Sequence, residues 1–165
     1  MKAVLVLLLA TAAACAGCAA SSPEPKKAVP TMTGTCYFCM KPINGDGGVL
    51  ATILPGFERT YRCVHCAFCD LRRQPGAEIR ARSLISGTEI VLTLGPGGWS
   101  ASPVDPVFLI LPETRGNCFQ VHQAFVDEAE FRAYLDEHPD LAKQNPKPLT
   151  LEQYVEQFPI LLRTS

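Results

Sequence analysis

Two Cys-x-x-Cys pairs constrain the fold of this chain more than any other feature. The first pair is Cys36 and Cys39, and the second is Cys63 and Cys66. If the segment between the pairs folds back on itself, four thiols meet, which is the number of ligands that a tetrahedral site for a soft metal requires. The sequence therefore predicts a cysteine knuckle, a tight turn that presents metal ligands, near the start of the folded region.

Further side chains that suit copper(I) or zinc lie close to these pairs. Met40 follows the first pair, and His65 lies inside the second. His65 also lies four residues before Cys69, so a helix over residues 64–73 places both on one face. We expect Cys36, Cys39, Cys63 and Cys66 to be the direct ligands, with His65, Cys69 and Met40 as supporting or alternative ligands.

A later pair of residues, Cys118 and His122, has two interpretations. They lie four residues apart on an expected strand over residues 118–125 and therefore share a face. They suit a mobile copper ligand pair, or Cys118 completes the cluster. They equally suit a buried small thiol and a hydrogen-bonded core histidine. We expect His138, at the end of a helix, to have no metal role.

The first residues are typical of an export signal rather than of a folded element. Lys2 precedes an apolar run, Ala3 to Ala14, that is too short to span a bilayer. The small residues ending at Gly17 and Cys18 resemble the lipobox of bacterial lipoproteins, in which the cysteine is acylated. Cys15 is the alternative acylated residue, and an ordinary secretory signal cut nearby is the alternative to a lipobox. Residues 1–17 are then a signal peptide and residues 18–33 a membrane tether, so we expect an anchor in the cell envelope, facing the periplasm or exterior.

The balance of charge excludes one class of partner. The chain has 15 basic and 16 acidic residues, and the basic residues form no stripe along the sequence. A protein that binds nucleic acid needs a concentrated positive surface to neutralise phosphates. We therefore expect no nucleic-acid partner.

The pattern of apolar residues and turn signals predicts an α+β fold over residues 34–160. Two hairpins are expected, one turning at Pro55-Gly56 and one at Ser86-Gly87, followed by a break at residues 95–98 and a buried strand at 107–111. Helices are expected over 64–73, 127–137 and 150–158, the last two from their capping residues. The prediction is β-hairpins and a small antiparallel sheet with short helices around the knuckle. Tyr37, Phe38 and Phe68 are expected to cover the cysteines, and Trp99 to anchor a loop.

Four segments of the chain carry a resemblance to the NosL family of bacterial copper-binding lipoproteins. They follow the lipobox and are CYFCMKPI, TYRCVHCAFCDL, NCFQVHQAF and KPLTLEQYV. The family supplies accessory proteins for the copper sites of nitrous oxide reductase. Here Lys41 stands where the family usually has methionine, and the cysteine cluster of residues 63–69 is additional. The resemblance implies handling of a transition metal, with copper(I) favoured over zinc, and delivery to an acceptor metalloprotein.

Other functions for the cysteines stay open at this stage. In an oxidising compartment they suit structural disulfides, although a bond within Cys-x-x-Cys closes so small a loop that it stabilises the fold by only about 2 kcal/mol. They also suit a structural zinc site. A thiol–disulfide oxidoreductase needs the motif at the start of a helix, which Pro42 and Asn44 exclude for the first pair but not for the second. No hydrolase triad or phosphate-binding loop is present, so we expect no enzyme.

Overall fold

The computed structural model describes residues 32–43, 49–112 and 120–157, and these form the predicted α+β fold from small antiparallel sheets and short helices. The larger sheet has five strands in the order β2-β1-β3-β4-β5, and the smaller has three in the order β7-β6-β8. No helix among the described residues is long and apolar enough to cross a membrane. The predicted signal peptide, lipidation site and most of the tether lie outside the described residues.

The five-stranded sheet is built from the hairpins that the turn residues predict. Its strands are β1 (Val49–Leu54), β2 (Phe57–Tyr61), β3 (Glu78–Arg82), β4 (Glu89–Gly95) and β5 (Gly98–Ser102). Gly56 takes the left-handed conformation, with φ of 82°, at the first turn, and Gly87 does so at the second, with φ of 70°. Glycine suits both turns because it has no Cβ to clash in this conformation.

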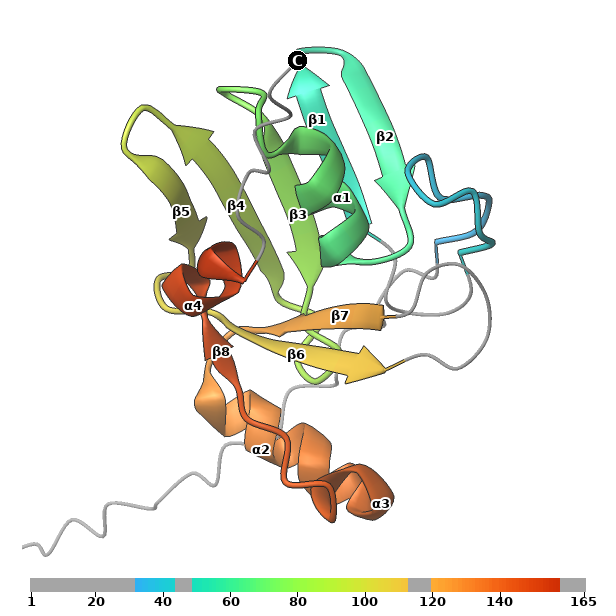
Figure 1. Cartoon of the computed structure of the whole chain (residues 1–165), viewed down its shortest axis with the longest axis vertical. Coiled ribbons are helices and arrows are strands. Elements are labelled where there is room, and N and C mark those ends of the chain that lie inside the picture. The colour runs from blue at the N-terminus through green and yellow to red at the C-terminus, as the bar shows by residue number, and fades with distance from the viewer. Residues whose placement is uncertain (1–31, 44–48, 113–119, 158–165) are drawn as a thin grey trace, which may run out of the picture.

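One face of this sheet buries alternate side chains against helix α1 (Val64–Leu71), which crosses it in Figure 1. Ile79 pairs with Leu92, and Ala81 pairs with Ile90. All four side chains are at most 2% exposed, and Phe68 and Leu71 of α1 join the same core. Because strand side chains alternate between faces, this core fixes the register of the sheet and the position of α1.

The smaller sheet forms a second layer with its own apolar cluster. It consists of β6 (Val107–Pro112), β7 (Gln120–Phe125) and the two-residue β8 (Leu149–Thr150). Figure 1 shows helix α2 (Glu128–Glu137) against this sheet, followed by α3 (Pro139–Ala142), whereas α4 (Leu151–Glu156) lies beside β5. The helix caps are as predicted: Asp127 accepts a hydrogen bond from the Glu130 amide, and Thr150 with Gln153 forms a capping box.

The sequence prediction missed three elements, β5, β8 and α3. The glycines at residues 95–98 do not end the sheet but turn the chain into β5, so Trp99 is a strand residue rather than a loop anchor. β8 and α3 were not expected. The expected strand at 118–125 begins, within the described residues, at Gln120.

Candidate metal centre

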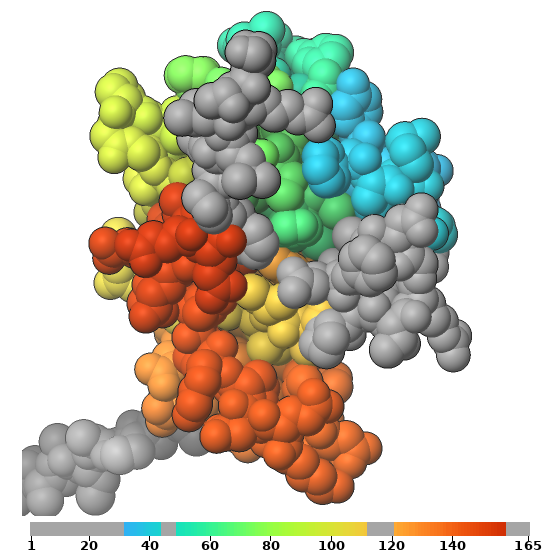
Figure 2. Space-filling model, viewed as in Figure 1, coloured from blue at the N-terminus to red at the C-terminus, as the bar shows by residue number. Residues whose placement is uncertain are grey.

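The first cysteine pair lies in a tight turn at the N-terminal end of the described fold. The Met40 amide donates to the Cys36 carbonyl over 3.0 Å, and the Cys36 amide donates to the Lys41 carbonyl over 2.8 Å. A third bond, from the Tyr37 amide to the Thr60 carbonyl over 3.0 Å, attaches the turn to β2. Residues 32–43, called the knuckle below, lie at the outer edge of the molecule beside the β1–β2 hairpin (Figure 2).

The second pair lies where β2 gives way to α1, as the sequence predicts. Cys63 is the N-cap residue of α1 with an extended backbone, and Cys66 lies in the first turn of the helix. The Cys66 amide donates to the Cys63 carbonyl over 3.1 Å, and the two Sγ atoms are 3.9 Å apart. The end of β2 therefore places the second pair beside the knuckle.

Three thiols converge closely enough to hold one metal ion. The Sγ atoms of Cys36, Cys39 and Cys66 all lie within 4.8 Å of one another. Three sulfur atoms that each bind one zinc ion at about 2.3 Å are about 3.8–4.0 Å apart, so these thiols must draw together by up to about 1 Å to share an ion. Cys63 lies beside Cys66 as a fourth thiol outside this group. The group contains only sulfur, and such soft donors select copper(I) or zinc over magnesium or calcium.

The three thiols differ in their exposure to solvent. Cys36 and Cys66 are fully buried, whereas Cys39 is partly exposed. All five described cysteines are free thiols. An ion held by this group would therefore be anchored by two buried sulfurs and approached from outside only on the side of Cys39.

Hydrogen bonds among the thiols shift their pKa values in opposite directions. A hydrogen bond from Cys66, helped by backbone groups of the turn, lowers the pKa of Cys36 to about 5. The same partner lowers the pKa of Cys63 to about 7. The pKa of Cys66 itself is raised, because its proton is shared with Cys36 and Cys63, and burial raises the pKa of Cys39 to about 11. At neutral pH, Cys36 is thus a thiolate ready to bind a cation.

His65, Cys69 and His122 form a separate set on the β7 side of α1. The Cys69 Sγ atom lies 3.5 Å from the His65 Nε2 atom, as the four-residue spacing predicts. The His65 and His122 rings contact each other, with their centroids 4.4 Å apart and their planes tilted by 34°. His122 is 1% exposed, and its Nδ1 atom lies 2.8 Å from the Tyr154 hydroxyl. Burial lowers the pKa of both imidazoles, that of His122 to about 3, so both are neutral.

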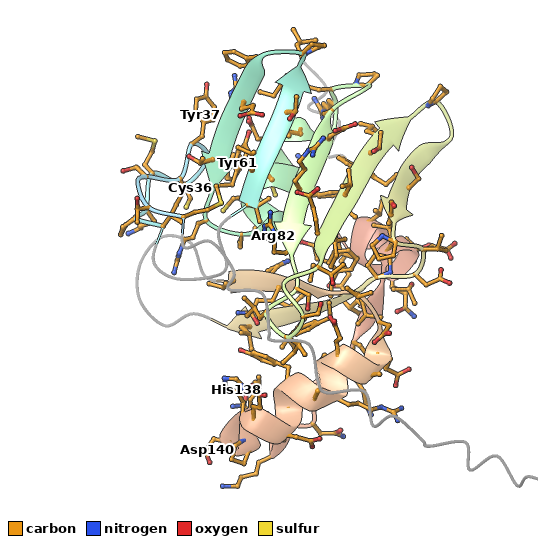
Figure 3. The ribbon with its side chains drawn as sticks, turned by 180° about the vertical axis from the view of Figure 1, so that it is seen from behind. Cys36, Tyr37, Tyr61, Arg82, His138 and Asp140 are labelled. Atoms are coloured by element: carbon orange, nitrogen blue, oxygen red, sulfur yellow. The ribbon has the colours of Figure 1, made fainter. Side chains whose placement is uncertain are left out.

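Of the remaining predicted ligands, Met40 points away from the thiol group. The Met40 side chain is 71% exposed, and Met40 adopts a left-handed backbone conformation with φ of 58°. Cys118 and the lipidation candidate Cys18 lie outside the described residues. His138, for which we expect no metal role, lies at the end of the molecule opposite Cys36 (Figure 3). Within the described part of the chain, the group of Cys36, Cys39 and Cys66 is the one set of potential metal ligands that converges.

A polar network connects the two segments that supply the thiols, and the sequence analysis did not find it. The Asp70 carboxylate of α1 accepts hydrogen bonds from Arg59 over 2.8 Å and from Tyr61 over 2.6 Å. The Arg59 guanidinium lies 3.8 Å above the ring of Tyr37, the neighbour of Cys36. The sequence did carry a signal, because Asp70 follows Cys66 by four residues and so lies on the same helix face.

The expected aromatic cover over the cysteines is only partly present. Phe68 is buried, but it packs against Trp99 and Tyr154, with ring centroids 5.1 and 5.7 Å apart. Tyr37 and Phe38 are about half exposed, at 52% and 47%. These two rings therefore leave the knuckle open to solvent instead of sealing it.

No family model, curated protein or solved structure matches this chain. The resemblance to the NosL family thus stays a prediction from short motifs. The case for function depends on the geometry of the thiols.

Proposed function

We propose that this protein is a membrane-anchored, extracytoplasmic lipoprotein that binds a soft transition metal, copper(I) in preference to zinc, and delivers it to a partner metalloprotein. The ligands of the metal are Cys36, Cys39 and Cys66, and Cys63 is an additional thiol beside Cys66. The observation that carries the proposal is the meeting of three Sγ atoms, from two distant segments, within 4.8 Å of one another. Bound metal is cargo in this proposal, and the protein catalyses no reaction.

The uneven burial of the ligands supports delivery in preference to permanent storage. Cys36 and Cys66 are buried and hold the ion, whereas Cys39 is open to an incoming ligand. Copper(I) bound to thiolates passes between proteins by exchange of ligands without a change of oxidation state. Such exchange needs one accessible ligand, and Cys39 supplies it.

The test is an anaerobic purification of the full chain in detergent, with free thiols and bound metal measured on the same sample. Copper(I) is then titrated against a competing chelator. We expect tight binding of one ion, and its loss in a variant with Cys39→Ser and Cys66→Ser. If the protein carries no metal, binds no copper(I) and holds its cysteines as disulfides even after anaerobic handling, the proposal fails. The protein would then be a surface lipoprotein stabilised by disulfides.

A structural zinc site is the second candidate, and the position of Cys63 favours it. The Cys63 Sγ atom is 3.9 Å from that of Cys66, and Cys63 is fully buried. A small shift of Cys63 would complete a closed site of four thiolates, which would contribute directly to folding. Removal of the metal by a chelator separates the two candidates. A structural zinc site predicts cooperative unfolding of the knuckle, whereas a delivery site predicts a folded protein with free thiols.

A further inference from the structure

Exposed apolar side chains gather on one part of the described surface, the knuckle and the β1–β2 hairpin beside it. Among the described residues, six large hydrophobic side chains are exposed, and five of them lie on the knuckle and the adjoining hairpin. We call these five the knuckle patch: Tyr37, Phe38, Met40, Leu54 and Phe57. The sixth, Val104, lies between β5 and β6. β5 is the edge strand of the larger sheet opposite to β2. A concentration of this kind marks an interaction surface, whereas single exposed apolar residues are ordinary.

The Arg59 side chain links the knuckle part of the patch to its hairpin part. The Arg59 guanidinium lies 3.8 Å from the centroid of the Tyr37 ring and 5.2 Å from that of the Phe57 ring, so it joins the knuckle to the hairpin. Leu54 is the direct strand partner of Phe57, which places both side chains on one face. Figure 3 shows Tyr37 beside β2, at the same edge of the molecule as Cys36 and Tyr61.

Arg59 adds little free charge to this surface. Its guanidinium is already paired with Asp70 over 2.8 Å. A partner is therefore recognised by apolar contact, and its binding should depend only weakly on ionic strength.

The backbone of Met40 supplies a second reason to regard this surface as functional. Met40 has φ of 58°, a conformation that costs a residue with a Cβ about 1 kcal/mol or more and that glycine adopts freely. The packing of the Met40 side chain does not offset this cost, because the side chain is 71% exposed. Exposed methionine is, however, well suited to binding surfaces because its flexible thioether adapts to a partner.

We propose that the knuckle patch is the docking surface for the acceptor of the metal, a second protein with an apolar face and a soft donor atom at its centre. This inference rests on the proposed function, and the chemistry of ligand exchange identifies the occupant. The donor atom of the acceptor must bond to copper(I) while the protein still holds the ion. Cys39 is the one partly exposed ligand of the group, and Phe38 and Met40 flank it in the sequence, so the acceptor must cover these side chains.

The exchange balances without any redox partner. A bond forms between copper(I) and the donor atom of the acceptor, and the bond between copper(I) and the Cys39 Sγ atom breaks. Copper stays in the same oxidation state throughout, and the released Cys39 thiolate takes a proton from solvent. Cys36 and Cys66 are then displaced by further soft donor atoms of the acceptor, each new bond to copper(I) replacing one bond to sulfur, and each released thiolate takes a proton from solvent.

The test follows isotopically labelled copper(I) as it leaves the full-length protein in detergent. Two receivers are compared: a copper-depleted extract of cell-envelope proteins, and the small chelator bathocuproine disulfonate. The docking variant is Leu54→Ser with Phe57→Ser, at the tip of the hairpin and away from the thiols. We expect transfer to the extract to slow by about tenfold or more, with transfer to the chelator unchanged.

Two further variants separate docking from folding. Met40→Gly relieves the backbone conformation, so it should fold at least as well as the original chain while transfer to the extract slows several-fold. Val104→Ser removes an exposed apolar side chain of similar exposure elsewhere and should leave both transfers unchanged. Equal transfer by all variants would overturn the docking proposal but not the proposed function.

Other outcomes assign the patch to a different occupant or reject the whole account. Self-association of the original chain that the double variant abolishes would assign the patch to a second copy. Quenching of a Tyr37→Trp reporter by brominated lipid in phosphatidylglycerol vesicles would assign it to the membrane. Either result would overturn the proposal of an acceptor. If the original chain binds no copper(I), the proposed function and the docking surface fail together.

Discussion

Helix α1 takes part in two groups of side chains that are suited to metals, and they differ in how their atoms meet. Cys66 joins Cys36 and Cys39 of the knuckle, and all three sulfurs lie within 4.8 Å of one another. His65 and Cys69 lie on the side of β7, where the imidazole of His65 contacts that of His122. The comparison shows that spacing along a helix selects a face, whereas convergence with a second segment creates a site.

The two groups also differ in their access to solvent. The thiol group has Cys39 at the surface. In the imidazole group, His122 is 1% exposed and contacts the hydroxyl of Tyr154, which is itself fully buried. The first arrangement suits an ion that must be received and released. The second arrangement suits a buried hydrogen bond between His122 and Tyr154, because a buried polar atom without a hydrogen-bond partner would destabilise the fold.

The largest expected effect is on copper(I) affinity, in a comparison of two cysteines in consecutive turns of α1. Cys66→Ser should weaken copper(I) binding by about a thousandfold, because each ligand of a structural zinc site contributes about 3–4 kcal/mol on average. Cys69→Ser should change the affinity by less than about tenfold. Competition titrations with a copper(I) chelator measure both. Equal losses in the two variants would mean that the two groups act as one site.

The next effect concerns the stability of the imidazole group. His122→Ala should lower the free energy of unfolding by about 3 kcal/mol, because it leaves a cavity and removes the Nδ1 partner of the Tyr154 hydroxyl. Urea unfolding measures the loss. An unchanged stability would show that His122 does not support the core.

The pH dependence of unfolding tests the same group independently. Burial lowers the pKa of His122 to about 3 from its ordinary value of 6.5. Below pH 6.5 the imidazole of His122 is therefore protonated in the unfolded chain but stays neutral in the folded chain. As a result, His122 should make the free energy of unfolding fall as pH drops from 6.5 toward 3. His122→Gln, which keeps a polar partner for Tyr154 but cannot titrate, should reduce this slope. The remaining slope in this range comes from other groups, among them His65, whose pKa is also lowered.

The smallest effect tests the network that links α1 to the knuckle. Asp70→Asn should cost about 1–2 kcal/mol, because Arg59 and Tyr61 lose a charged acceptor. It should also weaken metal binding by up to about tenfold, since Arg59 contacts the Tyr37 ring. The matched control is Glu128→Gln, which removes an exposed ion pair with Arg132 and should cost less than about 0.5 kcal/mol. Equal costs would show that the Asp70 network is an ordinary surface contact.

The parts of the fold that local chemistry determines were predictable from the sequence. Gly56 and Gly87 mark the turns of two hairpins, and Thr150 with Gln153 marks the start of a helix. β5 was missed because its half-buried residues form no apolar run and the glycines before it indicate a break. β8 has only two residues, and it exists because it pairs with β6. Such an element depends on the tertiary structure, which local patterns do not encode.

The candidate site was predictable to a similar degree. The sequence correctly indicated that the two Cys-x-x-Cys pairs come together and that His65 and Cys69 share a face. It did not indicate which cysteines would converge most closely. Cys69 lies three residues beyond Cys66, about 4.5 Å along the helix axis, and its Sγ atom contacts His65 instead of joining the knuckle thiols. That distinction depends on the placement of α1 on the sheet, which the buried core determines.

The most direct test of this account is X-ray absorption spectroscopy at the copper edge on the full chain loaded with one equivalent of copper(I) under anaerobic conditions. If Cys36, Cys39 and Cys66 hold the ion, the first coordination shell contains sulfur alone, and Cys69→Ser leaves the spectrum unchanged. Nitrogen from imidazole in that shell, lost when His65 or His122 is replaced, would contradict the account and place the ion in the second group.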